Sequence, residues 1–259
     1  MCAQPFARTI VASPAIVPVS FGEPATGRTD GGGQVRNLLL EGVVGSQAYG
    51  LATAGSDTDY AGIYAEPTNA LLGLHPPART SRTGRDGDDA VYHEIGKAMT
   101  LMLSCNPTAY ELLWLDTYTV ATDFGRELVS LRGCFASASR VRRAYVGYAA
   151  AQLRDLEQRP HPSPERRAKQ ARHTLRLLWQ GHQLYTTGFL PIRVPNPQRY
   201  LDFGQRAAVD GATRVRAVLG EYEAAFAEAT SALPQEPDEE PIESLLQRIR
   251  RAHLEEETL

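Results

Sequence analysis

The chain has 259 residues and a mass of 28.3 kDa, with 42% hydrophobic residues, 22% charged residues and a formal net charge of −3. This composition is ordinary for a globular protein and excludes global disorder and fibrous classes. No apolar run reaches the roughly 20 residues that a membrane helix needs. The N-terminus lacks the basic start and apolar core of a secretory signal. Three widely spaced cysteines favour neither a disulfide framework nor a zinc site, so a cytoplasmic location is expected.

The first part of the chain predicts an arm followed by a small α/β unit. Residues 1–35 are rich in Ala, Pro, Gly and Ser and predict a flexible arm. Short apolar runs predict buried strands at 38–44, 60–65 and 90–92. A polar segment full of Gly and Pro, at 75–89, predicts a mobile loop. From Glu94 the apolar residues recur with helical spacing.

The rest of the chain predicts a helical half. Asn106-Pro107 is interpreted as a helix stop and cap, because the residue before a proline avoids the helical region. Helical patterns then follow at 108–115, 124–131, 137–156, 165–185, 212–232 and 242–254. Residues 188–204 contain three prolines and predict a connector. The expected organisation is a small α/β domain at 36–116, after the arm at 1–35, and a helical domain at 117–259.

Charge is distributed unevenly along the chain. Residues 131–180 carry 11 Arg or Lys against 3 Asp or Glu, a local charge of +8. Residues 231–259 carry 3 basic against 8 acidic residues, a local charge of −5. A basic block inside an acidic protein can mark a face that binds phosphate or nucleic acid, although surface helices also carry arginine without such a role.

The strongest functional signal is the stretch 43–64, VVGSQAYGLATAGSDTDYAGIY. It predicts a strand, a Gly45-Ser46 turn that opens a short helix, and then Asp57 and Asp59 entering a second strand. Side chains two residues apart on a strand point to the same side, so this pair can hold one or two divalent cations. Backbone N–H groups at a helix start can receive a phosphate. Together these elements are the equipment of phosphoryl or nucleotidyl transfer.

The order of strand, Gly-Ser, Asp-x-Asp and strand resembles the signature of the polymerase-beta-like nucleotidyltransferase superfamily. Two further segments, HEIGKAMTLMLSCNPTAYELLW at 93–114 and AKQARHTLRLLWQGHQLYTTGFLPI at 168–192, resemble the RNA ligase-associated (RlaP-type) nucleotidyltransferase family. The resemblance extends over about residues 38–255. It implies an α+β fold in which a small mixed sheet with flanking helices is followed by a helical C-terminal half.

The resemblance also implies a third carboxylate on a neighbouring strand. Asp89 fits best, because the family wording places an aspartate just before a short apolar run and a helix. Asp88 and Glu94 remain alternatives: Asp88 would point to the opposite face of the strand, and Glu94 could instead be a first-turn acid favoured by the helix dipole. The expected catalytic and metal-binding residues are therefore Asp57, Asp59 and Asp89, with Mg²⁺ or Mn²⁺ as the cofactor.

Two sets of residues are candidates for binding the nucleotide. The first set follows from the motif and consists of Gly45, Ser46 and Ser56. The second set, Lys169, His173 and Arg176, has spacings of four and three residues and so shares one face of a predicted helix, which we expect to face the aspartates. That face could bind a triphosphate or a nucleic-acid backbone, and the alternative is a solvated basic stripe. Tyr49 could stack on a base or simply pack.

The sequence thus predicts a Mg²⁺-dependent nucleotidyltransferase that moves a nucleoside monophosphate from a nucleoside triphosphate to an acceptor hydroxyl and releases pyrophosphate. Association of the family with RNA ligases suggests an RNA end as the acceptor, hence RNA repair or modification. Two alternatives stay open: adenylylation of a protein or small molecule, and a catalytically inactive module that binds nucleotide or nucleic acid. Intact Asp57 and Asp59 argue against the inactive module. No membrane partner is expected, and the oligomeric state is not predicted.

Overall fold

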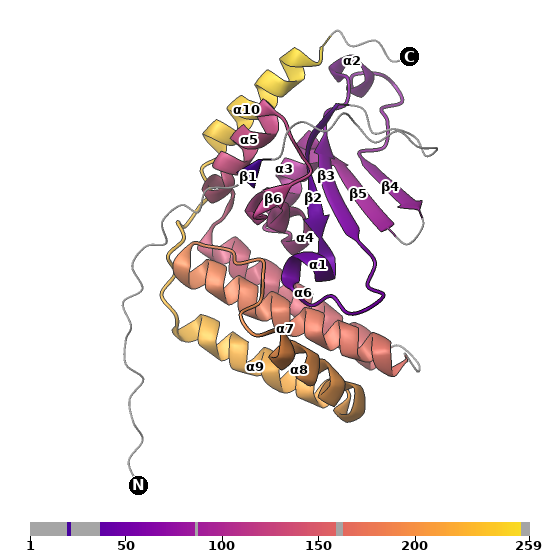
Figure 1. Ribbon diagram of the computed structural model, residues 1–259. Coiled ribbons are helices and arrows are strands. Elements are labelled where there is room, and N and C mark those ends of the chain that lie inside the picture. The colour runs from indigo at the N-terminus through magenta and orange to yellow at the C-terminus, as the bar shows by residue number, and fades with distance from the viewer. Residues whose placement is uncertain (1–19, 22–36, 86–87, 159–162, 255–259) are drawn as a thin grey trace.

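The computed structural model describes residues 20–21, 37–85, 88–158 and 163–254, which form a sheet half and a bundle of long helices (Figure 1). The sheet has five strands, and parallel pairing between its central strands makes it mixed. In spatial order the strands are β4 (Thr80–Arg85), β5 (Asp88–Glu94), β3 (Asp59–Tyr64), β2 (Leu38–Val44) and β7 (Val120–Ala121). Only β3 and β5 run parallel to each other among these pairs. The predicted α+β class with a small mixed sheet is confirmed.

Short helices, together with one helix from the end of the chain, flank the sheet. In chain order they are α1 (Gly45–Tyr49), α2 (Thr68–Leu71), α3 (Ile95–Leu103), α4 (Pro107–Tyr110), η1 (Glu111–Trp114), α5 (Asp123–Ser130), η2 (Arg132–Phe135) and α10 (Glu239–Ala252). The Asn106 side chain accepts hydrogen bonds from the N–H groups of Thr108 and Ala109, which confirms its interpretation as a cap. Helix α10 lies beside α5 and α3, so the end of the chain returns to the sheet half (Figure 1).

The helical half consists of two long helices covered by a shorter pair. These helices are α6 (Ala138–Gln158), α7 (Pro164–Thr187), α8 (Pro197–Asp210) and α9 (Ala212–Glu228). Helix α7 packs against α6, α8 and α9, and it therefore forms the centre of the bundle (Figure 1). No helix in the described part of the chain combines the length and the apolar character needed to cross a bilayer.

The hydrophobic core extends across the boundary expected at residue 116. One buried cluster joins the sheet to α3, α5 and α10 and also contains Tyr145 and Leu177 from the bundle. A second cluster lies within the bundle and includes Leu51, from the segment that follows α1. Tyr49 packs against both clusters. The sheet half and the helical half therefore meet around α1.

Two of the predicted segments differ from the structure. The loop expected at 75–89 contains β4, an edge strand with the polar sequence TSRTGR. Its described side chains are half-buried or exposed, so no buried face imposes an apolar alternation. The connector expected at 188–204 contains the start of α8. Its Pro197 occupies the first helical turn, where a proline costs no hydrogen bond, and the Asn196 side chain caps the helix by accepting from the Arg199 N–H group.

The expected N-terminal arm lies almost wholly outside the described residues. The exception is β1 (Ser20–Phe21), which pairs in parallel with β6 (Thr117–Tyr118). This pairing joins the beginning of the chain to the segment that follows η1.

Candidate active site

The Gly-Ser turn and Asp59 lie against each other at one end of the central strands. Strand β2 ends at Val44, and Gly45 begins α1 with a left-handed backbone, φ +70°. A Cβ atom added at Gly45 would overlap the Asp59 carboxylate. Glycine is therefore required at position 45 both by its backbone conformation and by the close approach of the carboxylate. The turn predicted to bind phosphate and a carboxylate predicted to bind metal are thus direct neighbours.

Asp59 and Asp89 are neighbours across the parallel strand pair. They are register partners at the start of the pairing between β3 and β5. Partners in a ladder project to the same side of the sheet, because side chains on both strands alternate with the same period. Asp59 is half-buried and Asp89 is exposed. The sheet topology therefore brings together two aspartates that lie 30 positions apart in the sequence.

Asp57 lies two residues before the first residue of β3 and is exposed. The preceding turn is closed by Ser56, whose hydroxyl accepts from the Thr53 N–H group at 2.8 Å and lies 3.2 Å from the Thr53 hydroxyl. Ser46 is half-buried within α1, and its carbonyl accepts from the Leu51 N–H group at 2.9 Å. These contacts hold the backbone of the segment that precedes Asp57.

The aspartates are chemically suited to a hard divalent cation, since carboxylate oxygens are the protein ligands that Mg²⁺ accepts. Two of them, Asp59 and Asp89, are adjacent in the sheet. Within the described ranges, no group of three His, Cys, Asp or Glu side chains is assembled in a way that could hold a metal ion. The aspartates are therefore ligands of the chemical type that Mg²⁺ binds, and a metal site made of three carboxylates stays a prediction.

Glu94, one alternative for the third carboxylate, is buried away from the aspartates. It is 0% exposed, and its side chain caps α3 by accepting from Gly96 N at 2.9 Å and Lys97 N at 3.3 Å. Its other oxygen pairs with Arg250 of α10 at 2.5 Å. Because Glu94 and Asp89 are five residues apart on β5, they point to opposite faces of the sheet. Glu94 therefore joins α10 to the sheet, and the geometry favours Asp89. Asp88 begins β5, and its side chain lies outside what the structure describes.

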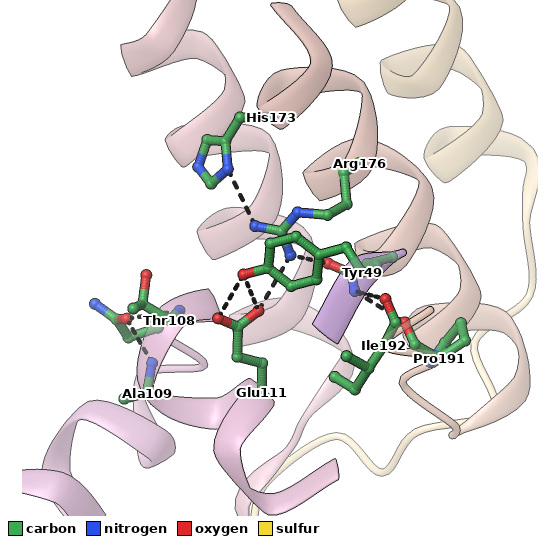
Figure 2. Close-up of polar contacts among 10 residues, drawn as sticks. Tyr49, Thr108, Ala109, Glu111, His173, Arg176, Pro191 and Ile192 are labelled. Carbon is green, nitrogen blue, oxygen red and sulfur yellow. Dashed lines mark hydrogen bonds and ion pairs between the residues drawn. The ribbon is translucent and has the colours of Figure 1, made fainter. Parts of the chain in front are cut away.

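The three basic candidates on α7 lie at increasing depth. Lys169 is exposed, His173 is half-buried and Arg176 is only 2% exposed. Arg176 Nη1 donates to Glu111 Oε2 at 3.1 Å and to Gln180 Oε1 at 2.5 Å, while its Nη2 lies 3.1 Å from His173 Nδ1 (Figure 2). The shared helical face therefore runs from the protein surface at Lys169 into the interior at Arg176. The guanidinium of Arg176 is engaged by protein groups, and a contact of this face with nucleotide stays a prediction.

Glu111 is the central residue of this buried network, and sequence analysis did not single it out. Its carboxylate accepts from the Tyr49 hydroxyl at 2.8 and 2.9 Å as well as from Arg176 (Figure 2). Burial raises the pKa of Glu111, and the positive charge of Arg176 opposes that shift. One signal was available, because a glutamate between apolar residues in AYELLW needs a partner when the segment is buried.

Tyr49 links this network to the Gly-Ser turn. The Arg176 guanidinium carbon lies 3.6 Å from the centroid of the Tyr49 ring, which is a close cation–π contact. The last residue of α1 is thus held by Glu111 at its hydroxyl and by Arg176 at its ring face. Tyr49 was a candidate either for stacking on a base or for packing, and the structure shows packing.

His173 completes the network as a neutral side chain. Burial and the positive charges of Arg176 and Lys169 lower the pKa of His173 to about 3. A neutral imidazole can accept a hydrogen bond from Arg176 through Nδ1, which a protonated ring could not do. The four side chains of Tyr49, Glu111, His173 and Arg176 therefore form one connected polar unit between α1, η1 and α7.

A mixed sheet with a Gly-Ser turn at one strand end and aspartates on the next two strands is the arrangement of the polymerase-beta-like nucleotidyltransferase class. Comparison with family models agrees: the model described as RlaP, RNA repair pathway DNA polymerase beta family, matches residues 29–236. The chain belongs to this family, whose name points to a nucleotidyltransferase. A search of curated proteins found no match.

Proposed function

We propose that the protein transfers a nucleoside monophosphate from a nucleoside triphosphate to the terminal hydroxyl of an RNA strand. The observation that carries this proposal is the contact between the Gly45 turn and the Asp59 carboxylate, with Asp89 beside it on the parallel strand. A triphosphate on this turn would have its reacting phosphorus next to both carboxylates. The family description, with its RNA repair pathway, supports RNA as the acceptor.

The transfer exchanges one phosphorus–oxygen bond for another. The acceptor hydroxyl oxygen attacks the α-phosphorus, the bond between the α-phosphorus and the bridging oxygen breaks, and pyrophosphate leaves with that oxygen. Asp89 takes the proton of the attacking hydroxyl, as a general base within reach of the reacting group. Gly45 and Ser46 hold the terminal phosphates through backbone N–H and hydroxyl groups. The exposed Lys169 offsets part of the negative charge of the nucleotide.

Asp57, Asp59 and Asp89 would hold the divalent cation, Mg²⁺ or Mn²⁺. Such an ion, when bound, supplies positive charge for the phosphoryl oxygens and the leaving pyrophosphate. Arg176 and Glu111 act differently, as positioning residues, because their contacts with Tyr49 fix the end of α1 relative to α7. Correct placement of a phosphate-binding turn matters for rate, since small errors in position weaken catalysis strongly.

The test is to incubate the protein with each α-labelled nucleoside triphosphate, Mg²⁺ or Mn²⁺, and a single-stranded RNA with a free 3′ hydroxyl. We expect label on the RNA, and none when the 3′ hydroxyl is blocked or when Asp59→Asn replaces the wild type. Label on a protein or on a small molecule instead would establish the adenylylation alternative. Nucleotide binding without any transfer, under all these conditions, would establish an inactive module.

A further inference from the structure

A cavity lies on the helical half, at the start of α6. It is an open hollow of about 750 Å³, bordered by α6, by the end of α7 and by the segment between α9 and α10. This volume lies within the range of small-molecule sites. The residues that line it are mainly polar or cationic and include Ser139, Arg142, Arg143, Tyr185, Thr230 and Gln235.

The wall of this cavity is held in place by hydrogen bonds. The Tyr185 carbonyl accepts from Ala232 N at 2.9 Å and from the Ser231 hydroxyl at 3.1 Å. The Pro234 carbonyl accepts from Ala138 N at 2.9 Å. The segment between α9 and α10 is therefore fastened to α7 and to α6, so the cavity is already formed before any ligand binds.

The charge of the cavity is positive and uncompensated. Arg142 and Arg143 are exposed, and neither has an acidic partner among the residues that the structure describes. The neighbouring Arg140, in contrast, lies 3.4 Å from Glu239 and 3.7 Å from Glu236. None of the described lining residues is acidic. Two guanidinium groups beside hydroxyl and amide groups are suited to a phosphate, which guanidinium binds through parallel hydrogen bonds.

An aromatic residue, half-buried against the main core cluster, lines the same hollow as these cations. Tyr185 lines the cavity, and its ring is held by an edge contact with Phe226 at 5.3 Å between centroids. Proteins that bind single-stranded nucleic acid combine positive charge along the backbone with aromatic rings that contact the bases. A free phosphate would need only the cations, so the ring favours a ligand that also carries a base.

We propose that this cavity binds one nucleotide unit of a single-stranded RNA, with a phosphodiester group between Arg142 and Arg143 and a neighbouring base against Tyr185. The inference rests in part on the proposed function, whose acceptor is RNA, and gives that RNA a contact outside the carboxylate site. It also assigns a role to part of the basic block at 131–180, where several other arginines are used within the protein.

The test is fluorescence anisotropy of the full chain with an end-labelled single-stranded RNA of about 12 nucleotides. For the double variant Arg142→Ala/Arg143→Ala we expect a Kd roughly fivefold to twentyfold weaker than that of the wild type at low salt. The slope of log Kobs against log salt should become less negative by about 0.7, because the contact with one phosphate of a single strand is lost. Arg142→Lys/Arg143→Lys should restore the slope while recovering only part of the affinity.

The matched control is Arg166→Ala/Arg251→Ala, which removes the same charge from exposed positions outside the cavity. An equal loss of RNA affinity in the control and in the cavity variant would overturn the proposal. A second result would also overturn the proposal. If a nucleoside triphosphate displaced all of the bound RNA, and if the cavity variant no longer bound that triphosphate, the cavity would hold free nucleotide and not RNA. A wild type that binds RNA through these arginines but transfers no nucleotide would refute the proposed function and leave this inference intact.

Discussion

Replacing Arg176 with methionine should destabilise the protein strongly. The guanidinium pairs with the buried Glu111 at 3.1 Å, donates to Gln180 and lies over the Tyr49 ring. Removal of one partner from a buried ion pair costs about 3–5 kcal/mol, because the other charge stays buried without compensation. Methionine fills part of the space, so we take no further cost for a cavity. The free energy of unfolding at neutral pH should therefore fall by about 3–5 kcal/mol.

The loss should depend on pH, because Glu111 can take up a proton. Burial already raises the pKa of Glu111 above its ordinary value of 4.5, and removing Arg176 removes the charge that opposes this shift. A folded-state pKa above the unfolded one contributes stability that is complete below the unfolded pKa and is lost as pH rises through the folded pKa. Between the folded-state pKa of Glu111 in the wild type and its higher value in the variant, Arg176→Met should lose about 1.4 kcal/mol of stability per pH unit relative to the wild type.

Urea unfolding followed by circular dichroism, at about pH 5 and about pH 8, measures both effects. The double variant Glu111→Gln/Arg176→Met should be more stable than the sum of the single losses predicts, and it should lose the extra pH dependence. The exposed Arg154→Met is the matched control and should change stability by less than about 0.5 kcal/mol. The reasoning is refuted if Arg176→Met behaves like this control, or if the losses at Glu111 and Arg176 simply add.

Three further predictions concern the aspartates, Glu94 and His173. Asp59→Asn and Asp89→Asn should each reduce nucleotide transfer at least a hundredfold, roughly the effect of losing one group that acts in the transition state, with unchanged melting temperature. Glu94→Gln should instead lower the unfolding free energy by about 2–4 kcal/mol, since it breaks the pair with α10, and should leave the transfer rate of folded protein nearly unchanged. The pKa of His173 in the folded protein is lowered to about 3, so its contribution to stability is complete above about pH 6.5 and declines as the pH falls towards 3. The variant His173→Gln should remove that part of the pH dependence in urea unfolding. Metal-independent activity in both aspartate variants would contradict the role of the aspartates. A Glu94→Gln protein that folds but does not transfer nucleotide would contradict the structural role of Glu94. An unchanged pH profile in His173→Gln would contradict the assignment for His173.

The motif around the Gly-Ser turn was readable from the sequence because it is local. Its two strands, its turn and the first two aspartates lie within the 27 consecutive residues 38–64, and their spacing predicted the strand ends at which they occur. Asp89 was harder to place, because its position beside Asp59 depends on the parallel pairing of β3 with β5. Resemblance to a family, and not periodicity, distinguished Asp89 from Glu94.

The elements that the sequence patterns did not predict lack a sequence signal for physical reasons. The described side chains of strand β4 are half-buried or exposed, so no buried face requires an apolar alternation in its polar sequence. Helix α8 starts with a proline, which usually marks a break, but a first-turn position removes the cost. Helix α10 was predicted as a helix, yet nothing in its own pattern indicated that it returns to the sheet half and pairs with Glu94. Local patterns specify elements better than they specify their partners.

The basic block at 131–180 shows why a charge count overstates the charge available to a ligand. Arg176 pairs with Glu111, and Arg132 lies over the ring of Trp114. Arg140 pairs with Glu239, the first residue of α10, and with Glu236 before it. These arginines join helices to their neighbours, and their contribution depends on burial and geometry. The block keeps exposed cations near the start of α6, at Arg154 and Arg166, and at Lys169, and these are the charges that an anionic substrate can meet.

Burial also explains how one helix can serve two purposes. At its exposed end, α7 offers Lys169 to solvent; one and two turns further on, His173 and Arg176 enter the interior and fasten the end of α1 through Tyr49. The turn that carries Gly45 is thus fixed at its start by the sheet and at its end by the bundle. A polar unit at such a junction resists sliding of one half against the other, because every displacement would leave the buried carboxylate of Glu111 with fewer partners.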